Sequence, residues 1–179
     1  MAARSAWLGI SIVLGVGLLA ACSQGPQLPQ LATVANVDLE RFMGRWYVLG
    51  SIPTFIERGA HNAVESYELD SDGTIATTFT FRRDGFDGKE VTYRPRGFVR
   101  DASNAVWGMQ FVWPLKAEYR IMYLDSEYTQ TVVGRSQRDY VWIMARTPAI
   151  AAEDYSRLAE LIGGQGYDTG DLKPVPQRW

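Results

Sequence analysis

The stretch DLERFMGRWYVLG, residues 38–50, decides how the rest of the chain is organised. Its first residue is an aspartate, which can cap a short helical turn over residues 39–42. Gly44 then allows the backbone to reverse into a strand, along which Trp46 and Tyr47 point to opposite faces. Both faces carry apolar or small residues, so the strand is expected to be buried on both sides. A large ring at the start of such a strand predicts a plug for one end of a closed barrel.

Composition narrows the classes of function. A length of 179 residues predicts one domain, and a net charge of −2 gives no indication of a nucleic-acid partner. The single cysteine excludes an internal disulfide, and the single histidine, His61, excludes a multi-histidine metal site. We therefore predict no metal, no cofactor and no nucleic acid.

The first residues have the pattern of a targeting signal. Arg4 precedes an apolar run over residues 7–19, which is short and rich in glycine for a membrane-spanning helix. Residues 19–22, Leu-Ala-Ala-Cys, resemble a bacterial lipobox. The resemblance implies cleavage before Cys22 and acylation of that residue, and multiple acyl chains anchor stably. Ser23 after it points to the outer membrane, by the same resemblance. The alternative is an ordinary secretory signal in which Cys22 has no role.

A linker is expected between this signal and the folded domain. Residues 23–36 contain two prolines, one glycine and no charge, so they predict an extended, flexible spacer. The predicted organisation is a signal peptide over residues 1–21, a lipidated linker over 22–36 and a barrel domain over 37–179.

From residue 46 onward the chain shows short alternating strands separated by turn signals, a pattern typical of an all-β barrel or sandwich. Short connections favour antiparallel neighbours, and closing the sheet removes its edge strands. Pro95 is expected to bend one strand or place it at an edge. The predicted strands are 46–50, 63–69, 74–81, 89–99, 106–113, 119–124, 128–134 and 140–146.

The pattern changes to a helical period after Pro148. Tyr155, Leu158 and Ile162 share one face of a helix predicted over residues 149–162. One amphipathic helix after eight strands must pack outside the barrel, against outward side chains that include Val141 and Ile143, together with Tyr47 and Leu49. The fold class is therefore an all-β, eight-stranded antiparallel up-and-down β-barrel with one C-terminal α-helix packed outside.

Large rings are concentrated on one face of the strand over residues 106–113, and such a concentration indicates a dry space. An eight-stranded barrel is wide enough to hold a small ligand, although ordinary core packing is the alternative for each residue. The candidate ligand-binding residues are Phe55, Tyr67, Phe79, Phe81, Trp107, Met109, Phe111, Trp113, Tyr119 and Trp142.

An apolar cavity favours an acyl chain, at roughly 0.8 kcal/mol per buried methylene, with polar groups at the mouth fixing a head group. Glu65 shares a face with Tyr67 and is costly to bury unless it is paired. It could receive a cationic head group, pair with an internal arginine, or simply reach the rim, which is the plainest of the three.

Three motifs in order carry a family resemblance. Gly44-Arg45-Trp46 resembles the GxW motif of the lipocalins, residues 124–128 resemble their second conserved region, and residues 142–148 resemble their third. Leu124 departs from the threonine that commonly begins the second region. The resemblance covers about residues 36–173 and is closest to the bacterial outer-membrane lipoproteins of the family, whose segments at 55–59 and 138–140 are also similar.

The resemblance implies structural roles for Gly44, Trp46, Asp125 and Arg146, with Arg146 lying across Trp46 at the closed end. It also implies that residues 51–62 form a lid over the open end, the alternative being a solvated loop with one buried ring. The implied function is binding of a fatty acid or lysophospholipid, for storage or transport in membrane maintenance. The implied location is the outer membrane, anchored to its lipid through Cys22, with the barrel in the periplasm. A homodimer is compatible with the sequence.

Two other functions stay open from the sequence. A lipocalin-type enzyme acting on a small hydrophobic substrate would need His61 beside a serine and a carboxylate, and the GxSxG elbow of hydrolases is absent. A structural lipoprotein with a filled barrel would require Trp107, Phe111 and Trp113 to contact one another. Binding without catalysis is the prediction.

Overall fold

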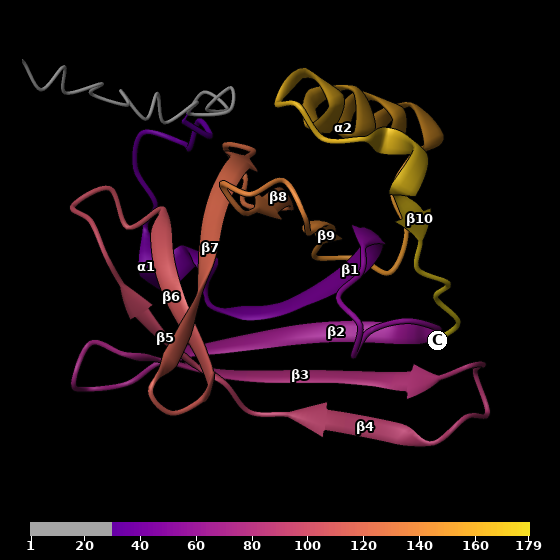
Figure 1. The fold of residues 1–179 in the computed structure, drawn as a ribbon, viewed down its shortest axis with the longest axis horizontal. Coiled ribbons are helices and arrows are strands. Elements are labelled where there is room, and N and C mark those ends of the chain that lie inside the picture. The colour runs from indigo at the N-terminus through magenta and orange to yellow at the C-terminus, as the bar shows by residue number, and fades with distance from the viewer. Residues whose placement is uncertain (1–29) are drawn as a thin grey trace, which may run out of the picture.

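The barrel is seen in a computed structural model that describes residues 30–179 (Figure 1). The predicted signal peptide, Cys22 and the first part of the predicted linker lie outside the described residues. The nine barrel strands are β1 (Gly44–Ile52), β2 (Ala60–Leu69), β3 (Ile75–Arg83), β4 (Glu90–Tyr93), β5 (Arg96–Val99), β6 (Val106–Val112), β7 (Leu115–Leu124), β8 (Gln130–Gly134) and β9 (Val141–Ala145). The remaining elements are α1 (Leu39–Phe42), α2 (Ala152–Gly164), the 3-10 helix η1 (Thr169–Asp171) and β10 (Lys173–Pro174).

The strands form a closed antiparallel barrel. Apart from β4 and β5, which both pair with β3, each barrel strand pairs with its neighbour in the chain, and β1 closes the ring by pairing with β9, Tyr47 opposite Ala145 and Val48 opposite Met144. Since β4 and β5 together form one wall beside β3, the barrel has eight walls. The prediction of an eight-stranded antiparallel barrel with one C-terminal helix is confirmed.

The wall predicted over residues 89–99 is divided at Pro95. β4 pairs with Phe79–Arg82 of β3, whereas β5 pairs with Ile75 and Ala76. Proline has no N–H to donate to a ladder, so the strand ends before it. The Pro95 carbonyl still accepts a hydrogen bond from the Thr77 N–H, at 3.1 Å, which keeps the two pieces in line.

A cluster of rings plugs the closed end. The Asp38 side chain caps α1 by accepting from the Arg41 N–H. Phe42 at the end of α1 is fully buried, and its ring centroid lies 5.0 Å from that of Trp46. The Trp46 indole N–H donates to the Phe42 carbonyl at 2.9 Å, which ties the short helix to the first strand. The predicted plug is therefore built from both halves of the 38–50 stretch.

Helix α2 packs outside the barrel, alongside β8 and β9 (Figure 1). Leu158 and Ile162 are fully buried against the outward side chains Val141 and Ile143, as the helical period predicts. Gly50 lets the helix approach closely, because a Cβ at that position would collide with the Tyr155 hydroxyl.

The predicted linker is partly structured. Leu31 is buried, with 1% of its surface exposed, in the layer between α2 and the barrel. The Val34 N–H donates to the Ile121 carbonyl at 3.0 Å and the Val37 N–H donates to the Ser103 carbonyl at 2.8 Å. The expectation of a flexible spacer as far as residue 36 is wrong for residues 31–36, because one buried leucine and backbone hydrogen bonds hold this segment on the barrel.

The C-terminal segment covers the outer face of β1. Strand β10 pairs with Gly50 and Ser51, and the Gln177 amide donates to the Val48 carbonyl at 2.7 Å. The Trp179 ring packs edge-on against Tyr47. Within residues 30–179, none of the helices has the length and apolar character needed to cross a membrane.

Candidate ligand-binding cavity

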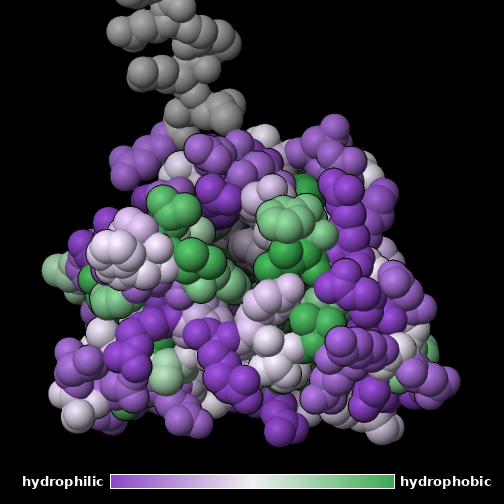
Figure 2. Space-filling model, turned by 60° about the horizontal axis from the view of Figure 1, so that its bottom comes forward, coloured by the Kyte–Doolittle hydropathy of each residue, from purple (hydrophilic) through white to green (hydrophobic). Residues whose placement is uncertain are grey.

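A cavity of about 570 Å³ lies inside the open end of the barrel. Its walls come from the β1–β2 connection, the interior of β2, β4, β6, β7 and β9, and the β8–β9 connection. Figure 2 shows a hollow on one face of the molecule with hydrophobic residues gathered around it. The lining residues are Thr54, Phe55, Ile56, Glu57, Glu65, Tyr93, Pro95, Met109, Phe111, Val112, Ala117, Glu118, Tyr119, Arg135, Tyr140 and Trp142.

The floor of this cavity carries polar oxygens. Glu65 on β2 lies opposite Trp46 of the plug, and the Tyr67 hydroxyl donates a hydrogen bond to its carboxylate. The hydroxyls of Tyr67 and Tyr119 lie 2.7 Å apart. Burial raises the pKa of the Glu65 carboxyl from 4.5 to about 8, and the charge of Glu57 acts in the same direction. Burial and the Glu65 charge also raise the pKa of Tyr119, so its phenol stays protonated.

The β1–β2 connection forms a lid that is held down by Glu57. The Glu57 Oε2 accepts from the Thr54 N–H at 3.0 Å and from the Trp142 indole N–H at 3.2 Å. Glu57 is 8% exposed, and burial raises its pKa although these hydrogen bonds oppose the rise. One carboxylate therefore joins the lid to the wall strand β9.

One side of the mouth is charged. Arg135 in the β8–β9 connection lines the cavity and forms an ion pair with Asp139 at 3.2 Å. Glu118 accepts from the Ser136 N–H at 2.7 Å and from Arg120 at 2.8 Å. Burial raises the pKa of Glu118, but these donors together hold it below its ordinary value.

The other side of the mouth is apolar and open to solvent. Phe55 of the lid is 77% exposed, and Phe111 and Val112 at the end of β6 are 47% and 68% exposed. All three also line the cavity, so the apolar interior continues onto the surface. Trp113 on the β6–β7 turn and Leu115 at the start of β7 extend this apolar rim.

The ten candidate ligand-binding residues occupy three levels of the barrel. Five line the cavity: Phe55, Met109, Phe111, Tyr119 and Trp142. Four lie buried in the core and do not line the cavity: Tyr67, Phe79, Phe81 and Trp107. The tenth, Trp113, lies outside the cavity.

Trp113 and Trp107 share the inward parity of the strand predicted over residues 106–113, but neither lines the cavity, for two different reasons. Trp113 shares the parity of Phe111, but β6 ends at Val112, so its ring projects from the turn and is 82% exposed. Trp107 faces inward, yet it stacks on Tyr119 at 4.9 Å between centroids and belongs to the plug. The prediction that Trp113 lines the cavity is therefore wrong. Trp107 lies in the packed, closed end of the barrel and does not line the cavity either.

Several lining residues were not found from the sequence. Glu57 and Tyr140 lie in connections, where strand periodicity has no bearing, and Tyr93 lies beside the break at Pro95. Of the three possibilities that the sequence leaves open for Glu65, the favoured one, a position at the rim, is wrong, because the side chain lies at the floor opposite Trp46. The unpaired acidic residue on an inward face was the signal that could have located it.

The structural motif residues meet at the closed end. The Arg146 guanidinium carbon lies 3.8 Å from the centre of the Trp46 ring, and the Asp125 carboxylate accepts from the N–H groups of Thr129 and Gln130 at 2.6 and 3.0 Å. Gly44 has a φ of +94°, and a Cβ there would lie 3.3 Å from Arg146. These contacts agree with the structural roles implied by the family resemblance.

His61 lies away from the cavity. Its Nδ1 is 3.0 Å from the Gly59 carbonyl, and its ring packs edge-on against Phe86. It is not one of the lining residues. Within residues 30–179, no group of three or more histidine, cysteine, aspartate or glutamate side chains is arranged to hold a metal ion.

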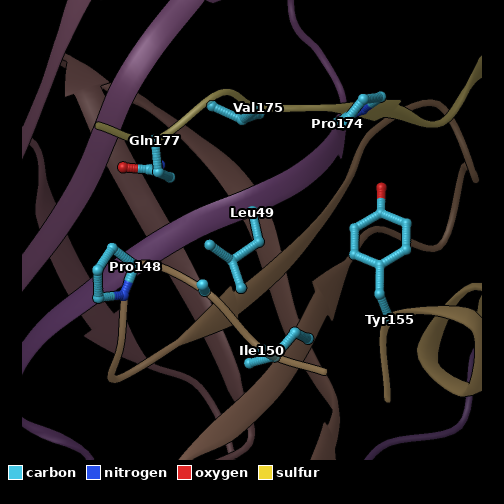
Figure 3. A pocket seen from close by; sticks show the side chains of 8 residues that line it. Leu49, Pro148, Ile150, Tyr155, Pro174, Val175 and Gln177 are labelled. Carbon is cyan, nitrogen blue, oxygen red and sulfur yellow. The ribbon is translucent and has the colours of Figure 1, made fainter. Parts of the chain in front are cut away.

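A second, smaller hollow lies outside the barrel. It has a volume of about 290 Å³ between β1, the C-terminal segment and the start of α2, and Figure 3 shows Leu49, Tyr155 and Val175 around it. Its walls are apolar apart from the Gln177 amide and the Tyr155 phenol, and this phenol is the one titratable group among the lining residues. The larger cavity inside the barrel is therefore the stronger candidate site.

The closed barrel, the plugged end and the inner cavity are combined in one known family. Residues 37–177 match the family model described as the Lipocalin-like domain, and the chain belongs to the lipocalin family. Proteins of this family generally bind small hydrophobic ligands, and the chain is a lipocalin of that kind.

Named relatives cover most of the chain. Temperature-induced lipocalin-1 of Arabidopsis thaliana is 29% identical over 155 residues, which span 83% of each chain. The outer membrane lipoprotein Blc of Citrobacter freundii is 28% identical over 172 residues, which span 94% of this chain and 95% of that protein.

Solved structures support the fold. The cockroach allergen Per a 4 superposes with a TM-score of 0.62 at 19% identity, over 85% of this chain and 96% of that one. Insecticyanin from Manduca sexta superposes with a TM-score of 0.64 at 11% identity, over 82% of this chain and 84% of that one. At such low identities these likenesses concern the fold alone.

Proposed function

We propose that the protein is a lipid-anchored lipocalin that binds a single-chain lipid, a fatty acid or a lysophospholipid, inside its barrel. Storage or transport of that lipid would serve the maintenance of the outer membrane. The observation that carries the proposal is the lidded cavity of about 570 Å³, lined by aromatic and aliphatic side chains and open at one end. Its volume lies in the range of roughly 300–1,000 Å³ that small-molecule sites occupy.

The chemistry of the mouth favours a lipid with one chain and an anionic head. The apolar wall rewards burial of an acyl chain at roughly 0.8 kcal/mol per methylene. Arg135 lines the cavity on the charged side of the mouth, where its guanidinium can attract a carboxylate or a phosphate. A lipid with its tail inside the barrel and its anionic head beside Arg135 would contact both the apolar wall and the charged side of the mouth.

The anchor is proposed from the lipobox-like residues 19–22 and from the relatives named as outer membrane lipoproteins. Acylated Cys22 would hold the chain on the periplasmic side of the outer membrane. Since Leu31 is fixed to the barrel, the segment from Cys22 to Leu31 can reach at most roughly 30 Å when fully extended. The barrel would therefore stay close to the lipid surface.

Binding, rather than catalysis, is proposed because His61 packs against Phe86 outside the cavity. A filled barrel is disfavoured for a separate reason. Phe111 faces the cavity, Trp107 stacks on Tyr119, and Trp113 lies at the surface, so the three rings do not fill one space.

Native mass spectrometry tests the proposal directly. The full chain carrying Cys22→Ser, which removes the acylation site, is titrated with oleate and with a lysophospholipid while tryptophan fluorescence is followed. We expect a saturable one-to-one complex with a shift of the emission. Phe111→Asp should weaken it by about tenfold because a charge replaces an apolar wall residue.

Trp113→Ala is the matched control, because this exposed ring lies on the next turn but does not line the cavity. It should bind as the parent chain does. Absence of a complex with either lipid, from a folded barrel, would end the lipid-binding proposal. Turnover of the lysophospholipid that is lost in His61→Ala would instead support an enzyme.

A further inference from the structure

Polar side chains lie at the floor of the cavity, and a lipid bound with its tail inward would make no hydrogen bond to them. Glu65 projects from β2 between Trp46 of β1 and Phe79 of β3, its partners in register. The Tyr67 hydroxyl donates to its carboxylate and lies 2.7 Å from the Tyr119 hydroxyl. One carboxyl and two phenols thus meet at the floor, below the apolar side chains of the cavity wall.

Glu65 has no basic partner among residues 30–179. None of the ion pairs in this part of the chain includes it, and Arg135, the basic residue that lines the cavity, pairs with Asp139. Burial and the Glu57 charge both raise the pKa of Glu65, which is the behaviour of a buried acid that lacks a cation. Such a group destabilises the fold unless something compensates for it.

Glu57 and Glu118, the other two carboxylates that line the cavity, are already engaged. Glu118 accepts from the Ser136 N–H and from Arg120. The Glu57 Oε2 accepts from the Thr54 N–H and from the Trp142 indole N–H. These bonds hold the lid, so Glu57 has a structural role that Glu65 does not share. The Glu65 carboxyl at the floor is therefore the acidic group available to a ligand.

The mouth above this floor is apolar on the side of the lid. Phe55, Phe111 and Val112 line the cavity and are also exposed to solvent. An alkyl chain can leave the cavity along these three apolar side chains. The cavity therefore offers an acid at its inner end and an apolar exit at its outer end.

We propose that Glu65 and Tyr119 form a head-group subsite at the cavity floor, with the buried Tyr67 hydroxyl behind them holding the Glu65 carboxylate, and that this subsite binds a long-chain primary amine with the ammonium group inward and the alkyl chain toward the mouth. The inference rests on the proposed function in that the same cavity buries the chain. It goes beyond that function by adding a second class of ligand, in the reverse orientation.

The donors and acceptors of the subsite fit an ammonium group. Three N–H donors can meet the carboxylate oxygens of Glu65 and the hydroxyl oxygen of Tyr119. The carboxyl proton leaves to solvent as the cation enters, so a neutral ion pair replaces an acid that has no basic partner. A carboxylate head would bring a second acid to the floor, and an alcohol would have one donor and no charge to offer.

A series of ligands with one chain length and different heads tests this inference. The full chain carrying Cys22→Ser is titrated with dodecylamine, dodecanol, dodecanoate and dodecyltrimethylammonium by calorimetry near neutral pH. We expect dodecylamine to bind about tenfold or more tightly than dodecanol, because its charge-assisted hydrogen bonds are the stronger ones. Dodecyltrimethylammonium, which has the charge but no N–H donor, should lose most of that advantage.

Glu65→Gln should weaken the binding of dodecylamine by about tenfold. The same variant should bind dodecanoate as tightly as the parent chain does, or more tightly. Glu68→Gln is the matched control, since Glu68 lies on the same strand and faces solvent. Thermal unfolding establishes that both variants are folded. Equal binding of amine and alcohol, or a loss of dodecanoate alone in Glu65→Gln, would overturn the amine subsite while leaving chain binding intact. If none of the four ligands binds, the proposed function fails as well.

Discussion

Arg146 lies over the indole ring of Trp46, with its guanidinium carbon 3.8 Å from the ring centre. The same guanidinium donates to the carbonyls of Arg41, Phe42, Arg45 and Tyr128, at 2.7 to 3.1 Å. One side chain at the end of β9 therefore joins α1, the start of β1 and the β7–β8 turn. The closed end of the barrel is fixed by a planar cation as much as by the packing of rings.

Arg146→Ala should destabilise the barrel without altering its cavity. Loss of the cation–π contact and of several hydrogen bonds to carbonyls predicts a decrease of about 2–4 kcal/mol in the free energy of unfolding. Arg146→Lys should recover only part of it, because an ammonium cannot reach four carbonyls from above the ring. Chemical denaturation measures both, with the exposed Arg45→Ala as control. Equal stability of the three variants would contradict this account.

Leu31 joins the segment before the barrel to helix α2, and the strength of this contact can be measured. Its side chain is buried with Leu158 and Ile162. Leu31→Ala should lower the free energy of unfolding by about 2–4 kcal/mol, the cost of a cavity at a buried leucine. Leu69→Ala, at a position that is 40% exposed, should cost clearly less.

Hydrogen exchange separates a local effect from a global one in this case. If Leu31 holds α2 against the barrel, Leu31→Ala should lower amide protection in α2 more than in β3, which lies on the far side of the barrel from α2. If Leu31→Ala and Leu69→Ala lower the free energy of unfolding by similar amounts, or if protection of α2 is unchanged in Leu31→Ala, the segment before α1 lies on the barrel without stabilising it.

The local patterns of the sequence predicted the walls of the barrel, because alternation and turn residues are short-range signals. The Asp-Ser-Asp-Gly turn at residues 70–73, for example, separates β2 from β3, between the strands predicted over 63–69 and 74–81. The burial of Leu31 could not be predicted in this way. Its partners lie about 90 or more positions later in the chain, and its neighbours in sequence have the composition of a spacer.

Alternation also predicts the face of a side chain but not its height in the barrel. Trp107, Phe111 and Trp113 share one parity, yet they lie in the plug, in the cavity and on the turn. Height depends on the register between strands and on where each hairpin ends, which are properties of paired strands. The same reason explains why Glu65 was found to face inward while its place at the floor was not.

The hydrogen bond between Trp142 and Glu57 should control how fast a ligand leaves. Trp142→Phe keeps a ring in the wall but removes the N–H that donates to the lid carboxylate at 3.2 Å. Loss of one hydrogen bond to a charged or partly charged group predicts a rate of release about five to tenfold higher. Stopped-flow displacement of bound oleate measures it.

Trp113→Phe makes the same chemical change on an exposed ring outside the cavity and is the control for this experiment. It should leave the release rate unchanged. If Trp142→Phe also leaves the rate unchanged while weakening affinity, Trp142 contributes contact area alone and the lid is held by other groups.

Glu65 predicts an unusual dependence of stability on pH. Its pKa is raised from 4.5 to about 8 in the folded protein, so between these values the folded state holds a proton that the unfolded state has lost. The free energy of unfolding therefore falls as the pH rises through this window, by at most about 1.4 kcal/mol per pH unit from this group. Glu57, whose pKa burial also raises, contributes in the same direction.

Glu65→Gln should flatten this slope, because an amide has no proton to lose. Above about pH 8 the variant should be more stable than the parent chain, whereas near pH 4.5 the two should be alike. Glu68→Gln, on the solvent side of the same strand, should keep the parent slope. Urea denaturation at a series of pH values measures all three. A parent chain whose stability is flat or rises between these pH values would show that the floor carboxyl is solvated or paired, and the head-group subsite would then lose the buried acid on which it depends.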